Sequence, residues 1–136
     1  MPNLPVHYYF PAVFSYHNDG ISVTFPDLPG CVSYGENEPD AIKSAQQCLA
    51  LHICGMEEDG DEIPGAASIS EINLQKGEAI VLIDAFMPPV REHIQNSPVK
   101  KTLTIPKWLN EAAVARKVNF SGVLQQALMK ELDIRK

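Results

Sequence analysis

The chain has 136 residues, of which 45% are hydrophobic and 21% are charged, and its formal net charge at pH 7 is −6. This composition indicates one packed domain with at most a small second one, and it excludes wholesale disorder. No apolar stretch approaches the ~18 residues that a membrane span needs, and no secretory leader opens the chain, so we expect a cytoplasmic protein with no membrane partner. Cys31, Cys48 and Cys54 have no framework spacing, which predicts free thiols.

The first part of the chain is typical of short strands. Residues 8–16 and 21–25 have strand composition, and the second segment alternates apolar and polar side chains. The sequence HNDG at 17–20 supplies turn residues between them, so we expect a β-hairpin. Residues 31–35 follow two proline breaks and are expected to form a third short strand.

Residues 37–56 change to the spacing of an amphipathic helix, for which Asn37 is a suitable N-cap and Gly55 a candidate end. Residues 79–86 are mostly apolar and predict a buried strand. The prolines of the following segment predict a linker. We therefore expect an α+β fold with the order β-β-β-α-β over residues 1–87, a linker at 88–98 and a second domain at 99–136.

Charge is distributed unevenly between these two parts. Residues 1–98 contain three basic and fourteen acidic residues, a net charge of −11, whereas residues 99–136 contain eight basic and three acidic residues, a net charge of +5. The basic part is expected to attract polyanions, and the acidic part suits a basic protein partner.

The sequence VKKTLTIP at residues 99–106 predicts an amphipathic strand that Pro106 ends, followed by helices near 107–117 and 123–132. So small a unit cannot form a core alone, and its single strand has unpaired edges. We therefore expect a homodimer in which two such strands pair antiparallel above four helices. The expected dimer core consists of Leu103, Ile105, Trp108, Leu109, Leu124 and Leu128.

A two-stranded ribbon of this kind fits the major groove of DNA. Lys100, Thr102 and Thr104 share its polar face and are the expected base-reading residues. The start of the second helix offers free N–H groups for a phosphate. The expected phosphate-binding residues are Lys101, Lys107, Asn119, Phe120, Ser121 and Gly122. The alternative is a dimerisation element with solvated lysines and no DNA contact.

Residues 8–45, with the sequences FPDLPGC and GENEPDA, resemble the HicB antitoxin family of type II toxin–antitoxin systems, and the acidic turn DGDEIPG also fits. The tail resembles the ribbon-helix-helix domain of Arc and MetJ. The resemblance implies an N-terminal domain like a reduced ribonuclease H fold that masks a HicA-type toxin, a small basic RNA-cleaving protein. It also implies a C-terminal domain that binds operator DNA and represses its own operon. Tetramers could form through the N-terminal domains, and no toxin-contact residue can be transferred individually.

Two other functions are compatible with parts of the sequence. A metal-dependent nuclease with a DNA-targeting tail would need clustered carboxylates, and Asp84 inside an apolar strand is the most interesting candidate. Cys48 and His52 have the i, i+4 spacing of metal ligands, but no second pair is visible. A ligand-sensing repressor is the other alternative. We expect no enzymatic activity, no metal and no cofactor. The remaining candidate carboxylates, each with a structural explanation, are Asp19, Asp27, Asp40, Asp59 and Asp61.

Overall fold

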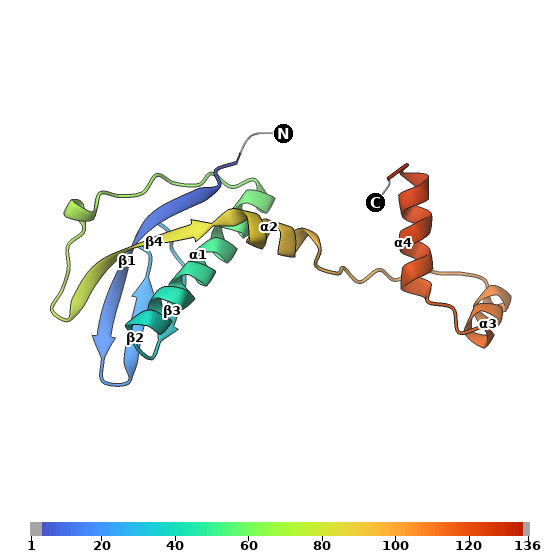
Figure 1. The fold of residues 1–136 in the computed structure, drawn as a ribbon, viewed down its shortest axis with the longest axis horizontal. Coiled ribbons are helices and arrows are strands. Elements are labelled where there is room, and N and C mark those ends of the chain that lie inside the picture. Colours follow the sequence, from blue (N-terminus) through green and yellow to red (C-terminus); the bar gives the residue numbers. More distant parts are fainter. Residues whose placement is uncertain (1–3, 135–136) are drawn as a thin grey trace. The chain divides into compact units, whose positions relative to one another are not determined.

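A computed structural model describes residues 4–134. The chain divides between Ser97 and Pro98 into two compact units, which are described separately. Figure 1 labels the helices and strands of both units. Among the described residues, no helix is both long and apolar enough to cross a membrane.

The N-terminal unit contains one antiparallel sheet. Its strands are β1 (His7–His17), β2 (Gly20–Thr24), β3 (Val32–Gly35) and β4 (Glu78–Phe86), in the spatial order β3-β2-β1-β4. The β1–β2 hairpin and the third and fourth strands confirm the strands expected from the sequence. Phe10, Ala12 and Phe14 of β1 and Ile83 and Ala85 of β4 belong to the core, because every second side chain of a strand lies on the same face of the sheet.

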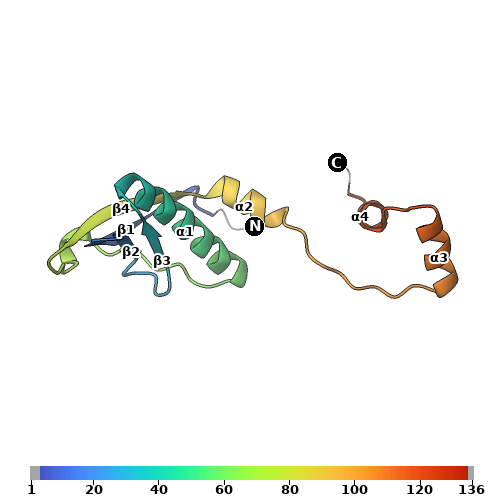
Figure 2. The same cartoon turned by 90° about the horizontal axis from the view of Figure 1, so that it is seen from below.

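Helix α1 (Glu38–Asp59) packs against one face of this sheet (Figures 1 and 2). The Asn37 side chain accepts a hydrogen bond of 3.0 Å from the Asp40 N–H, which confirms the expected N-cap. The helix passes through Gly55, the expected end, and stops at Gly60, whose φ of 74° favours glycine. The helical stripe Ala41, Ala45, Leu49 and Ile53 is fully buried and, with the sheet, forms the core of an α+β fold.

The prediction of a linker at 88–98 is wrong for most of this segment, because Met87–Gln95 form helix α2. Pro88 and Pro89 lie in the first turn, where a helix does not use the missing N–H. Val90 and Ile94 pack against the core of the N-terminal unit. The N-terminal unit therefore ends about ten residues later than the sequence indicated, whereas the C-terminal unit begins at Pro98, next to the expected start at residue 99.

The C-terminal unit consists of an extended segment and two helices, α3 (Lys107–Ala115) and α4 (Phe120–Glu131). Both helices lie within the expected ranges, give or take a few residues at each end. Residues 98–106 form no ladder within the described part of the single chain. The strand expected at 99–105 needs a partner strand, so its pairing with a second copy stays a prediction.

Candidate functional site

The extended segment before α3 has two distinct sides. Lys100, Thr102 and Thr104, the expected base-reading residues, are exposed. Leu103 and Ile105 instead line a hollow formed with the two helices, and Lys101 lines it as well. The alternation expected from the sequence is therefore present even without a ladder, and Lys101 lies with the apolar side chains rather than with Lys100.

The hollow has a volume of about 580 Å³ and is lined mainly by apolar side chains. No described residue of the C-terminal unit is buried in the single chain, and Trp108 is 70% exposed. Of the expected dimer core, Trp108 and Leu128 lie outside this lining. We call this surface the apolar hollow. Its lining residues are Lys101, Leu103, Ile105, Leu109, Asn110, Ala113, Val118, Phe120, Ser121, Val123, Leu124 and Ala127.

The turn between the two helices begins α4 with a side-chain cap. The Asn119 side chain accepts a hydrogen bond of 3.1 Å from the Gly122 N–H, and its carbonyl accepts one of 3.0 Å from Val123. The Gly122 N–H therefore already has an acceptor, and the backbone N–H groups left free at the start of α4 are those of Phe120 and Ser121. Lys107 lies 3.9 Å from Glu111 in a solvent-exposed pair, so its ammonium group remains available to an anion.

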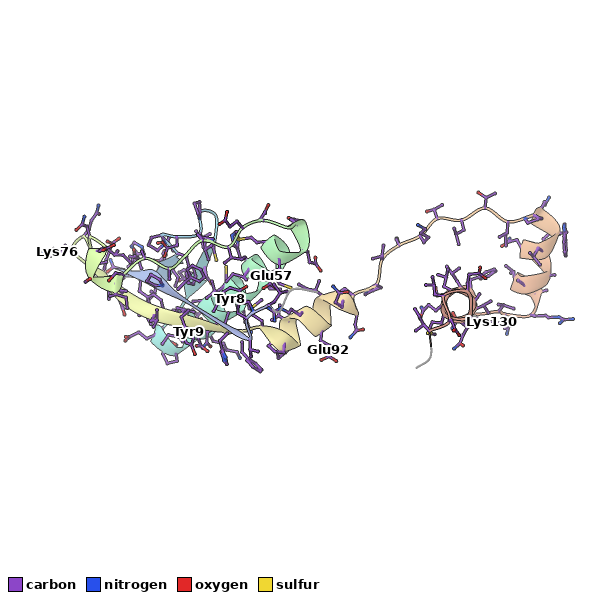
Figure 3. The ribbon with its side chains drawn as sticks, turned by 90° about the horizontal axis from the view of Figure 1, so that it is seen from above. Tyr8, Tyr9, Glu57, Lys76, Glu92 and Lys130 are labelled. Carbon is purple, nitrogen blue, oxygen red and sulfur yellow. The ribbon has the colours of Figure 1, made fainter. Side chains whose placement is uncertain are left out.

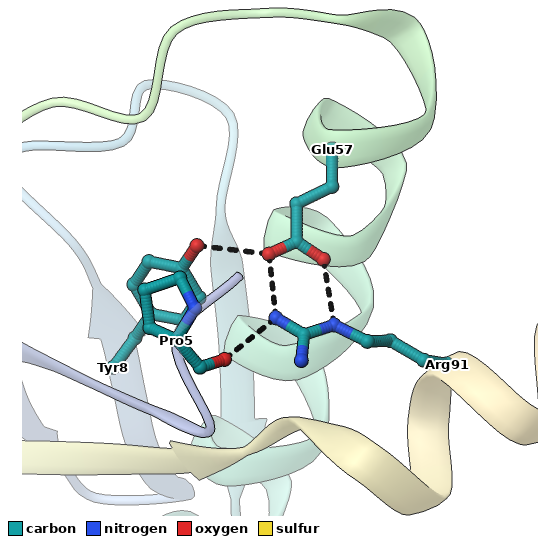
Figure 4. A network of polar contacts seen from close by, with 4 residues as sticks. All are labelled: Pro5, Tyr8, Glu57 and Arg91. Atoms are coloured by element: carbon teal, nitrogen blue, oxygen red, sulfur yellow. Dashed lines mark hydrogen bonds and ion pairs between the residues drawn. The ribbon is translucent and has the colours of Figure 1, made fainter. Parts of the chain in front are cut away.

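A polar network that sequence reasoning missed joins α1, α2 and β1 (Figure 4). Arg91 donates from Nε to Glu57 Oε1 at 2.9 Å and from Nη2 to Glu57 Oε2 at 2.7 Å. Tyr8 donates to the same Oε2 at 2.8 Å, and the Pro5 carbonyl accepts from Arg91 Nη2 at 2.7 Å. Figure 3 shows Tyr8 and Glu57 at the end of the sheet where α2 begins. The network fixes α2 to the N-terminal unit.

Burial and hydrogen bonding together shift the pKa values of Tyr8 and Glu57 in this network. Burial, then the hydrogen bond to Glu57 and its charge, raise the pKa of Tyr8 to about 12. Burial alone would raise the pKa of Glu57, but the hydrogen bonds from Arg91 and Tyr8 and the charge of Arg91 bring it below its usual value. Glu57 is therefore a carboxylate at neutral pH, and Tyr8 is a phenol that donates to it.

A second hollow, of about 660 Å³, lies at the C-terminal end of α1. Four carboxylates line it, and no lysine or arginine is among its lining residues. The other lining residues are Leu28, Pro29, Leu51, His52, Gly55, Met56 and Pro64. We call this surface the acidic hollow. Its carboxylates are Asp27, Asp59, Asp61 and Glu62.

Three of the carboxylates that a nuclease could use, Asp27, Asp40 and Asp84, accept hydrogen bonds from other residues of the N-terminal unit. Asp84 accepts a hydrogen bond of 2.9 Å from Gln46, and Asp27 accepts one of 3.1 Å from the Ala67 N–H. No group of three or more His, Cys, Asp or Glu residues within 4–134 is placed to hold a metal ion. Cys48 contacts Cys31, whereas His52 lines the acidic hollow.

Comparison with known proteins decides the family. The model of the HicB-like antitoxins of bacterial toxin–antitoxin systems matches residues 9–128, which include most of both units. The chain belongs to this family. The HicB-like assignment confirms the resemblance drawn from the FPDLPGC and GENEPDA sequences, and the chain is an antitoxin of a toxin–antitoxin system.

Two curated relatives match this HicB-like chain in sequence. A 14.9 kDa protein from the rep–hol intergenic region of Haemophilus phage HP1 (strain HP1c1) is 30% identical over 103 residues, 74% of each protein. Antitoxin HicB 2 of Photorhabdus laumondii subsp. laumondii is 32% identical over 76 residues, which are 56% of this chain and 50% of that protein.

Two solved structures share the fold of this HicB-like chain. A chain of a toxin–antitoxin complex from Streptococcus pneumoniae has a TM-score of 0.62 and 24% identity, covering 92% of this chain and 99% of that one. The antitoxin HicB of Burkholderia pseudomallei has a TM-score of 0.54 and 22% identity, covering 92% of this chain and 98% of that one. The α+β fold is therefore shared with these two solved chains.

Proposed function

We propose that this antitoxin binds and neutralises a HicA-type RNA-cleaving toxin through its N-terminal unit and represses its own operon by binding operator DNA as a dimer. The observation that carries the DNA-binding half is the apolar hollow, which no described residue of the chain covers. Leu103 and Ile105 face this hollow, whereas Lys100 and Thr102 of the same segment are exposed.

A second copy of the C-terminal unit covers the hollow most simply. Pairing of residues 99–105 from two chains would supply the hydrogen bonds that the extended segment lacks and would bury the helices beneath it. The same pairing places Lys100, Thr102 and Thr104 of both chains on one polar surface, which fits a major groove. This arrangement corresponds to a ribbon-helix-helix dimer.

Operator binding can be measured by fluorescence anisotropy with a duplex from the region upstream of the antitoxin gene. Lys100→Ala with Thr102→Ala should weaken specific binding by at least about tenfold and should reduce the salt dependence, because each lysine lost removes a cation near the DNA. Lys130→Ala on α4 removes a charge from an exposed position outside this surface and serves as the control. Equal losses in the two variants would assign only a general attraction to the basic unit.

Charge supports the toxin-binding half of the proposal. The N-terminal part of the chain is strongly acidic, and the acidic hollow combines four carboxylates with apolar walls. An arginine or lysine of a basic toxin could place its aliphatic stem against Leu51 and Met56 and its cation among the carboxylates. Such complementarity accelerates association and selects the partner.

The product of a basic reading frame beside the antitoxin gene is the protein to test, with inhibition of its RNA cleavage as the readout. Asp59→Lys with Asp61→Lys should weaken inhibition by at least about tenfold. Helix stability is retained, because a lysine suits the C-terminal end of α1. Glu71→Lys with Glu92→Lys gives the same charge change at exposed positions outside the hollow. Unchanged inhibition in the first variant would place the toxin elsewhere.

A further inference from the structure

Two of the three cysteines lie side by side in the N-terminal unit. Cys31 immediately precedes β3 and Cys48 lies in the middle of α1, and their Sγ atoms are 3.6 Å apart. The Cys48 thiol also donates to the Val32 carbonyl at 3.2 Å, which holds it beside the start of β3. A disulfide is about 2.05 Å long, so the two sulfur atoms need to approach by only about 1.5 Å.

The two thiols differ in access to solvent. Cys31 is 1% exposed, whereas Cys48 is only half-buried. A small oxidant therefore reaches Cys48 first. Cys54 is buried at 3% exposure, and Cys31 is the cysteine that contacts Cys48.

We propose that Cys31 and Cys48 are a modification site at which hydrogen peroxide produces a reversible intramolecular disulfide. The Cys48 thiolate attacks one peroxide oxygen, the O–O bond breaks, and hydroxide leaves and takes up a proton as water. The resulting Cys48 sulfenic acid is then attacked by Cys31, which loses its proton as the S–S bond forms and a second water leaves. Two thiols are oxidised to one disulfide and one peroxide is reduced to two waters.

The position of the bond gives it a structural effect. It would join the β2–β3 connection, which contributes Asp27, Leu28 and Pro29 to the acidic hollow, to α1, which contributes Leu51 and His52. Cross-linking these segments restricts the unfolded chain and raises the stability of the unit. Burial, together with the hydrogen bond and charge of Cys48, raises the pKa of Cys31 to about 12, so the second step is expected to be slower than attack by an ordinary thiol.

The full-length protein can be treated with a small excess of hydrogen peroxide, unfolded in iodoacetamide and measured by intact mass and peptide mapping. We expect a loss of about 2 Da, one alkylated cysteine at position 54, a linked peptide containing Cys31 and Cys48, and reversal by dithiothreitol. The oxidised protein should melt at least about 5 °C higher than the reduced one.

Cys48→Ser should abolish the linked peptide and the rise in melting temperature, whereas Cys54→Ser should retain both. Cys48 is partly exposed, so serine is accommodated there, and circular dichroism of the variant verifies its fold. The proposal is overturned if iodoacetamide still alkylates all three cysteines after the peroxide treatment. It is equally overturned if Cys48 proceeds to sulfinic acid while Cys31 stays free, because the neighbouring thiol would then not have captured the intermediate.

Discussion

Glu57 on α1 and Arg91 on α2 form a bidentate ion pair, with 2.9 Å from Arg91 Nε to Glu57 Oε1 and 2.7 Å from Arg91 Nη2 to Glu57 Oε2. The Glu57 side chain is only 6% exposed and that of Arg91 is 23% exposed. Tyr8 donates to the same carboxylate, so three segments far apart in the sequence meet at one group. The pair links α2 to the core of the N-terminal unit.

Replacing Glu57 by glutamine is predicted to lower the free energy of unfolding by about 1–3 kcal/mol, since Arg91 would be left partly buried without a counter-charge. Urea unfolding followed by circular dichroism measures this change. Glu111→Gln removes the acid of the exposed pair with Lys107 and should cost less than about 0.5 kcal/mol. Similar costs for the two variants would mean that the Glu57–Arg91 pair contributes no more than a surface pair.

The same pair predicts a dependence on acid. The pKa of Glu57 is below its usual value of 4.5 in the folded protein, so its stabilisation is complete above pH 4.5 and is lost as the pH falls through the lowered pKa. The difference in unfolding free energy between wild type and Glu57→Gln should therefore be constant near neutrality and should shrink below about pH 4.5. A difference that stays constant down to pH 2 would contradict this assignment.

Gly35 at the end of β3 lies directly against the start of α1. A Cβ atom at this position would overlap the backbone nitrogen and Cα of Ala41. Gly35→Ala is predicted to destabilise the unit by about 2 kcal/mol or more, because a helix backbone cannot move aside cheaply. Gly65→Ala, where nothing lies within 4 Å, is the control and should be close to neutral. Thermal melts of the two variants measure the contrast.

Local patterns predicted most of the sheet and α1. Ile21, Val23 and Phe25 alternate with polar residues along and just after β2, and this alternation determines which face of the strand is buried. Asn37 caps α1 by accepting a hydrogen bond from the N–H of Asp40, only three residues further along the chain. Helix α2 was not predictable in this way. Pro88 and Pro89 locally disfavour a helix. The helix is instead stabilised by contacts with the core and by the hydrogen bonds of Arg91 to Glu57, 34 positions earlier in the chain.

The candidate sites divide in the same way. The two sides of the 99–105 segment could be predicted, because a period of two sorts Leu103 and Ile105 from Lys100. The acidic hollow could not, since it brings Asp27 from one loop to Asp59 and Asp61 at the end of α1. The composition predicts that the N-terminal part of the chain is acidic. The position at which these carboxylates gather depends on how α1 packs.

The apolar hollow predicts a dimer that a single buried charge would disrupt. Leu124→Glu places a carboxylate among the lining residues and should convert a dimer to a monomer at micromolar concentration, as measured by analytical ultracentrifugation. Gln125→Glu adds the same charge at an exposed neighbouring position outside the lining and should leave the dimer intact. A wild-type protein that is monomeric at all concentrations would contradict the pairing of C-terminal units.

The start of α4 allows the role of Asn119 as a cap to be separated from a role in phosphate binding. Asn119→Ala loses the hydrogen bond to Gly122 and should cost about 1 kcal/mol of stability. Asn119→Asp keeps the cap and suits the helix dipole, so its melting temperature should be unchanged or higher. Its added negative charge beside the free Phe120 and Ser121 N–H groups should nevertheless weaken operator binding severalfold at low salt. Operator affinity equal to wild type in Asn119→Asp would place the phosphate away from this helix start.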